Sequence, residues 1–396
     1  MNCLAPLLAA LASLNAMVDT DPSPAFEFRR GDRVVLLGDA LIERDARYGW
    51  LETRLTLDHP EKELTFRNLG WSGDTVAGLS RAGFDPPEAG FRQLVEQVKA
   101  AAPTVLVVGY GMADSFDGEP GLDRFTKGYL KLLDAVAPEG VRLVFLSPIA
   151  HENHGPPLPD PAAHNRMLEI YSRAIESIAR QRGAFYIDLF TPTRVKSGRW
   201  LTDNGIHLTE TGYEALAALV GGALEGKSTS PAPVVEIARD GKVHASPHLE
   251  VKSTQVEPAR LRFTLVRERP GEPAPRLVAH GLSPGRYRLV IDGRPVALRS
   301  ADRWANGVAI DAGPDHDQLE RLRRMINRKN ELFFYRWRPQ NITYLFGFRK
   351  HEQGNNAVEI PRFDPLIADA EREIKTLASF APRDYELSLI EKEDAR

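Results

Sequence analysis

The feature that most constrains this chain is an alternation of short apolar runs and helix-length segments over residues 33–224. Short, mainly apolar runs of this kind are typical of strands buried on both faces of a sheet. The runs are residues 33–38, 64–70, 104–109, 142–147 and 184–189. The helix-length segments are residues 42–57, 88–101, 122–136, 163–182 and 210–223. This order predicts a mostly parallel five-stranded sheet with helices on both faces, a three-layer α/β/α domain.

Length and charge exclude several other classes of protein. A chain of 396 residues predicts two or three domains. The net charge of −3 offers no electrostatic basis for a nucleic-acid partner, and none is predicted. The single cysteine, Cys3, excludes an internal disulfide framework and a cysteine-rich zinc site. No apolar run reaches the ~20 residues of a spanning helix, so no membrane span is expected.

Polar and glycine-containing motifs follow three of the predicted strands, where parallel sheets bind their ligands, and a fourth motif lies near the end of the domain and leads into a helix. They are residues 38–41 (GDAL), 68–75 (NLGWSGDT), 109–115 (GYGMADS) and 202–208 (TDNGIHL). Their order and positions resemble the four blocks of the SGNH/GDSL hydrolase family, over roughly residues 33–216 of a domain placed at 30–225. The resemblance implies a flavodoxin-like fold and the hydrolysis of ester bonds.

The same resemblance implies a role for each block. A first-block serine attacks the ester, and a late histidine, oriented by an acid three residues earlier, takes its proton. A second-block glycine N–H and a third-block asparagine help to form the oxyanion hole. By position, Gly70 is that glycine and His207 that histidine. Ala40 replaces the nucleophilic serine, Ala113 the oxyanion asparagine and Asn204 the orienting acid.

These substitutions predict a retained scaffold with disabled serine chemistry. Losing the serine costs on the order of 10⁶ in rate, and losing one oxyanion donor costs a further ~10²–10³. The predicted catalytic positions are His207, Asp203 and Asn204, with Ala40 in place of the nucleophile; Asp39, Ala40, Gly70 and Ala113 form the pocket; and Asp74, His151 and Glu152 lie at its rim. The expected ligand is a small molecule or glycan, for example an acylated one.

Neither a cofactor nor a metal is predicted. The residues weighed as metal ligands are His151, Glu152, His154, Asp203 and His207. The pair His151 and His154 lies in a proline-rich loop rather than on a helix that would fix both rings.

Two other functions stay open at this stage. Ser72 or Ser115, in the same loops, would serve as a relocated nucleophile facing His207 in an active ester hydrolase. Alternatively, the protein is a structural or cell-surface interaction protein that binds through its C-terminal half. The oligomeric state is not fixed by the sequence.

The C-terminal half has a different character. A polar, proline-containing linker at 226–233 leads into short β-favouring runs, which predict a small antiparallel β domain over 230–311. Residues 312–396 are expected to form a helix and an aromatic, basic extension. Seven of the chain's 32 aromatic residues lie within 333–348. We expect these rings to pack the extension onto the first domain while its arginines pair with surface acids.

The N-terminus predicts export. Residues 4–18 are almost entirely apolar and end abruptly at acidic residues and a proline. A short apolar run with small residues near its end is typical of a signal peptide, here placed at 1–18. The expected location is periplasmic or extracellular.

Overall fold

The computed structural model describes residues 25–194, 200–226, 232–257, 259–270 and 274–391. The predicted signal peptide lies outside these residues. The first domain contains β1 (Arg33–Gly38), α1 (Ala40–Tyr48), α2 (Trp50–Asp58), β2 (Thr65–Asn68), α3 (Pro87–Ala101), β3 (Val105–Gly109), α4 (Gly118–Val136), β4 (Arg142–Leu146), α5 (Ala162–Arg182), β5 (Phe185–Ile187), α6 (Phe190–Arg194) and α7 (Glu210–Leu224).

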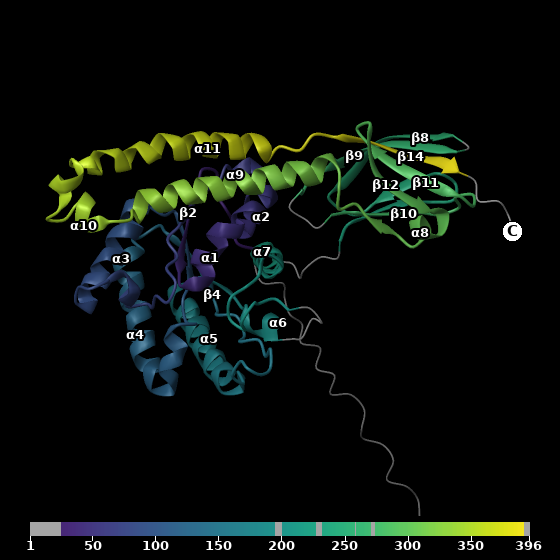
Figure 1. Cartoon of the computed structure of the whole chain (residues 1–396). Helices are drawn as coiled ribbons and strands as arrows, with labels where there is room; N and C mark the ends of the chain where they lie inside the picture. Colours follow the sequence, from purple (N-terminus) through teal and green to yellow (C-terminus); the bar gives the residue numbers. More distant parts are fainter. Residues whose placement is uncertain (1–24, 195–199, 227–231, 258, 271–273, 392–396) are drawn as a thin grey trace, which may run out of the picture.

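The first sheet confirms the predicted α/β/α architecture. Its five strands are all parallel and follow the order β2-β1-β3-β4-β5. Alternate residues of β1 enter opposite cores: Val35 faces the side covered by α3, α4 and α5, and Val34 faces the side covered by α2 and α7 (Figure 1). The strand that follows β1 in the sequence, β2, lies on one side of it, and β3 lies on the other. The ends of β1 and β3 therefore flank the switch in strand order, where ligands bind.

The single helix expected over 42–57 is instead two helices, α1 and α2. Gly49 separates them with a left-handed backbone at φ 69°. A Cβ atom at this position would lie 2.3 Å from Asn327 Oδ1. The break therefore allows a helix from the C-terminal half to approach closely.

The C-terminal half folds into two small sheets and a helical hairpin. Its elements are β6 (Val234–Ile237), β7 (Val243–Ala245), β8 (Leu249–Glu257), β9 (Arg260–Arg267), β10 (Arg276–Ala279), β11 (Arg286–Ile291), β12 (Arg294–Ser300), α8 (Ala301–Ala305), β13 (Val308–Ala309), α9 (Pro314–Trp337), α10 (Ile342–Leu345), α11 (Phe363–Leu377) and β14 (Arg383–Glu391). The sheet orders are β13-β10-β6-β7 and β12-β11-β14-β9-β8.

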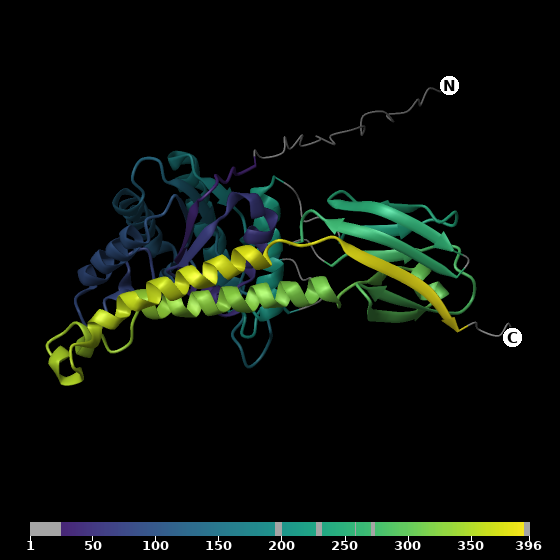
Figure 2. The ribbon, with the colours of Figure 1, turned by 90° about the horizontal axis from the view of Figure 1, so that it is seen from above.

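Two features differ from the sequence-based expectation of an antiparallel domain ending at 311. Strands β6 and β10 pair in parallel, because the chain makes a long excursion through the other sheet between them. Strand β14 comes from the far C-terminus and lies between β9 and β11 (Figure 2). The chain therefore leaves the β region through α9 and returns to it after α11.

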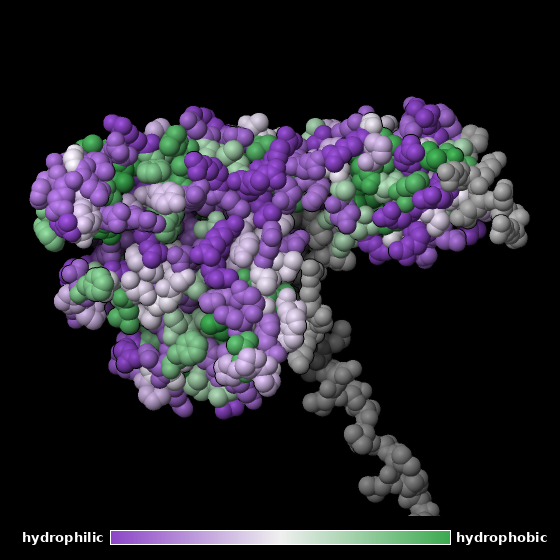
Figure 3. All heavy atoms as spheres, viewed as in Figure 1, coloured by the Kyte–Doolittle hydropathy of each residue, from purple (hydrophilic) through white to green (hydrophobic). Residues whose placement is uncertain are grey.

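The helices α9 and α11 form a hairpin along the first domain, and the expected packing of the aromatic segment is confirmed for its first part, whereas Phe346 and Phe348 are exposed. Leu332 and Phe333 of α9 join the first domain's core, and Trp337 makes an edge-on contact with Trp71. The outer surface of the hairpin is mostly hydrophilic (Figure 3). Within the described ranges, no helix is both long enough and apolar enough to cross a membrane.

A buried lysine fixes α9 to the first domain. Lys329 has no exposed side-chain surface, and its Nζ donates to Glu52 Oε2 at 2.7 Å, to the Phe66 carbonyl at 3.1 Å and to Asn330 Oδ1 at 2.7 Å. These three acceptors match the three N–H bonds of an ammonium. Since Phe66 lies on the edge strand β2, the lysine ties α9 to both α2 and the sheet.

We expect Lys329→Met to lower the free energy of unfolding of the first domain by about 3–5 kcal/mol, because it leaves the Glu52 carboxyl buried without its partner. Urea unfolding followed by tryptophan fluorescence measures this loss. The matched control is Arg328→Met, since Arg328 makes an exposed ion pair with Glu331 and its loss changes stability by less than about 1 kcal/mol. Equal stability of the two variants would contradict a central role for Lys329.

Candidate functional site

Loops from distant parts of the first domain meet around one cavity of about 240 Å³. Ala40 at the start of α1, Ala113 after β3 and His207 before α7 all line it, together with Asp39. The cavity lies beyond the ends of β1 and β3, at the switch in strand order. The structure thus brings together the residues predicted from three of the four motifs.

Gly70, predicted as an oxyanion donor, does not line this cavity. Its N–H donates to Asn68 Oδ1 at 2.9 Å. A Cβ at Gly70 would lie 2.1 Å from the backbone nitrogen of Glu43. A glycine is therefore required here for close packing against α1, and its N–H is already engaged. Gly73, three residues later, is the member of this motif that reaches the cavity.

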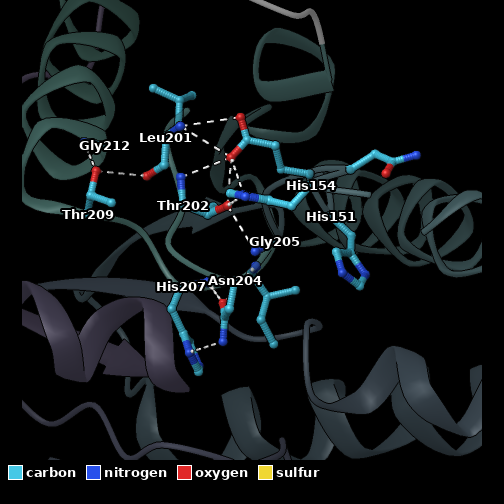
Figure 4. A network of polar contacts seen from close by, with 12 residues as sticks. His151, His154, Leu201, Thr202, Asn204, Gly205, His207, Thr209 and Gly212 are labelled. Carbon is cyan, nitrogen blue, oxygen red and sulfur yellow. Dashed lines mark hydrogen bonds and ion pairs between the residues drawn. The ribbon is translucent and has the colours of Figure 1, made fainter. Parts of the chain in front are cut away.

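Asn204 determines which nitrogen of His207 carries the proton (Figure 4). Asn204 Oδ1 accepts from the backbone N–H groups of Ile206 and His207, at 3.2 and 3.0 Å. Its Nδ2 therefore faces the ring, 3.0 Å from His207 Nδ1. Because an amide N–H can only donate, Nδ1 accepts and a neutral ring carries its proton on Nε2. A carboxylate at 204 would favour the opposite tautomer, in which Nε2 can act as a base.

Asp203 does not supply the missing carboxylate. It is half-exposed, and its Oδ2 pairs with Arg44 at 3.1 Å. Burial lowers the pKa of His207, and the nearby Arg44 lowers it further while Asp203 opposes this. Both effects favour a neutral ring at pH 7.

The two serines considered as alternative nucleophiles face other partners. Ser115 is buried, and its Oγ lies 2.8 Å from both the Met112 carbonyl and His164 Nε2. Ser72 is exposed, and its backbone N–H donates to Glu43 Oε2. Neither serine is hydrogen-bonded to His207, and neither lines the cavity.

The three predicted rim residues lie outside the cavity wall. Asp74 is fully buried and pairs with Arg81 at 2.7 Å. Glu152 accepts from the backbone and hydroxyl of Thr202, at 2.9 and 2.6 Å, and so holds the segment that leads to Asn204 (Figure 4). His151 lies 3.0 Å from His164, Nδ1 to Nδ1.

Metal-ligating residues do not gather at this site. Among the residues that the structure describes, no group of three or more histidine, cysteine, aspartate or glutamate side chains is arranged to hold a metal ion.

Comparison with known families identifies the first domain. Residues 36–215 match the family model of the GDSL-like lipases and acylhydrolases. This is a GDSL-like lipase/acylhydrolase domain. A search of curated proteins finds no match.

Several solved structures are similar to this chain at low sequence identity. BT4096, a gut microbial diltiazem-metabolizing enzyme, is 15% identical with a TM-score of 0.69, over 93% of this chain and 100% of that one. Axe2, an acetylxylan esterase from Geobacillus stearothermophilus, is 17% identical with a TM-score of 0.40, over 52% and 100%. A lipase/acylhydrolase from Enterococcus faecalis is 19% identical with a TM-score of 0.38, over 51% and 100%.

The apolar wall of the GDSL-like domain's cavity was not predicted from the sequence. It comes from Leu41, Tyr110, Met112, Phe116, Ile149 and Ile206. All of them except Ile149, which follows β4, lie within or directly after the quoted motifs, and this is the one signal that marks them in advance. Ser147 also lines the cavity, but its Oγ accepts from the backbone N–H groups of Leu189 and Phe190, at 2.8 and 3.0 Å.

We expect the neutral His207 ring to be protonated on Nε2, which long-range ¹H–¹⁵N NMR correlations detect. Asn204→Asp should move the proton to Nδ1 and raise the pKa of His207, because a carboxylate stabilises the imidazolium. Asp203→Asn is the matched control, and it should leave the tautomer unchanged. A proton found on Nδ1 in the unmodified protein would contradict this assignment.

Proposed function

We propose that the GDSL-like domain is a binding domain for an acylated small molecule or glycan, and that it is disabled as a serine esterase. The observation that carries this proposal is the contact between Asn204 Nδ2 and His207 Nδ1. This contact leaves Nε2 of His207 as an N–H donor. His207 lines a cavity in which Ala40 stands in place of a nucleophile. We further propose export, on the basis of the apolar residues 4–18.

The chemistry of the wall supports an acyl group as the bound portion. The cavity is lined by residues such as Met112, Phe116 and Ile149, which favour an apolar chain. The His207 N–H suits the carbonyl oxygen of an ester or amide. A ligand with both features would be held without a group able to attack it.

Three losses combine to prevent catalysis by a serine mechanism. Ala40 cannot attack, His207 in this tautomer cannot accept the proton, and Gly70 has no free N–H for an oxyanion. The loss of the serine alone removes about 10⁶ in rate, and each lost oxyanion donor removes ~10²–10³ more.

We expect the unmodified protein to hydrolyse p-nitrophenyl butyrate no faster than its His207→Ala variant. Ala40→Ser alone should add little, because the proton acceptor is still reversed. Ala40→Ser/Ala113→Asn/Asn204→Asp should exceed the same triple variant carrying His207→Ala by at least about a hundredfold. Initial rates at 405 nm measure all five proteins.

Activity of the unmodified protein that disappears in His207→Ala would show the disabled assignment to be wrong. If Ser72→Ala or Ser115→Ala also removes that activity, the relocated-nucleophile hypothesis holds instead.

The binding half of the proposal has its own test. We expect hexanamide, an apolar chain with a carbonyl acceptor, to bind the unmodified protein in ligand-detected NMR. Ala40→Leu fills the cavity and should abolish the signal, whereas the exposed substitution Glu88→Gln, outside this cavity, should preserve it. Undiminished binding by Ala40→Leu would place the ligand elsewhere.

A further inference from the structure

A second cavity of about 480 Å³ lies between α3 and α4. It uses the same two loops as the first cavity but different residues of them. Gly73 and Ala113 face the first cavity, whereas Thr75 and Asp114 face the second. Its volume falls within the range of small-molecule sites, roughly 300–1,000 Å³.

The walls of this second cavity are largely apolar. Val76 and Leu79 come from the loop after β2, Phe91 comes from α3, and Phe125 comes from α4. Leu79 is 49% exposed at the mouth, whereas Val76 and Phe125 are buried. The cavity therefore has an apolar interior that is open to solvent at one end.

Asp114 supplies an unsatisfied carboxyl to this apolar wall. The residue is only 6% exposed. Its Oδ1 accepts a long hydrogen bond of 3.4 Å from the Val76 N–H, while its Oδ2 is buried without a hydrogen-bond partner. The hydroxyl of Thr75 is also buried and unpartnered. Buried polar atoms of this kind are expected to meet a donor or a ligand.

The cations around the cavity are engaged elsewhere. Arg81 is buried against Asp74, Arg124 pairs with Asp117 at 2.5 Å, and the Lys131 ammonium lies 4.5 Å from the centre of the Phe91 ring. No ion pair to Asp114 occurs in the described part of the chain.

The electrostatic environment of Asp114 agrees with this lack of a partner. Burial raises the pKa of Asp114 to about 7, and the nearby carboxyls of Asp39 and Asp74 raise it as well. A positive charge placed beside Asp114 would relieve both effects.

We propose that this second cavity binds a small organic cation, a protonated amine on an aromatic or short alkyl body. The ammonium lies beside Asp114 and Thr75, and the apolar body packs against Val76, Phe91 and Phe125.

The test uses the full chain and isothermal titration calorimetry with 2-phenylethylamine. The amine should bind at least tenfold more tightly than 2-phenylethanol, and 3-phenylpropanoate should not bind. Asp114→Asn should weaken amine binding at least tenfold. Because a change at a buried residue can disturb folding, Ala77→Trp is a second variant: Ala77 is exposed at the cavity mouth, and the larger side chain should block entry.

A comparison between the two cavities locates the amine. Ala40→Leu fills the first cavity and should leave amine binding unchanged. The proposal is overturned if the alcohol binds as tightly as the amine, if Ala77→Trp binds the amine as well as the unmodified protein, or if Ala40→Leu alone removes binding. None of these outcomes depends on whether the first cavity binds an acyl group.

Discussion

The arrangement of this chain depends on a buried ammonium group. Lys329 gains all three of its hydrogen bonds from the first domain and from its own helix, so α9 has one position in which the charge is satisfied. In that position the end of the helix reaches α1 and the loop after β2. The Arg338 guanidinium lies 3.3 Å from the centre of the Trp71 ring and pairs with Glu43 at 2.8 Å. The C-terminal half therefore supports the loop that contains Gly70.

An amide NH2 in place of one carboxylate oxygen at residue 204 reverses the direction of the hydrogen bond with His207. Aspartate and asparagine have nearly the same shape, and both can accept bonds from the backbone at the start of α7. They differ in what they present to His207, since a carboxylate accepts from the ring and the amide of Asn204 donates to it. The scaffold can thus be preserved while the proton moves to Nε2 of His207, a residue that lines the same cavity as Ala40.

The sequence was sufficient for features that depend on local pattern. Buried parallel strands such as β1 show their character in a few consecutive residues, and the motifs after them had to meet because parallel strands end at one edge. Features that depend on contacts between residues far apart in the sequence could not be predicted from it. Strand β14 alternates Tyr385, Leu387 and Leu389, but nothing local indicates that it inserts between β9 and β11. Likewise, the hydrogen bond that engages Gly70 depends on the rotamer of Asn68.

Each of the two cavities has a buried carboxyl in its wall, Asp39 after β1 and Asp114 after β3. Burial raises the pKa values of Asp39 and Asp114 to about 7, one carboxyl beside each cavity, while the buried Arg81 is committed to Asp74. A carboxyl whose pKa rises on folding stabilises the folded state at low pH, and that contribution disappears as pH rises from about 4 to 7. Near neutral pH, ionisation of these two groups therefore opposes folding. Backbone amides offset part of this, and hydrogen-bond donors bound in the cavities would offset more.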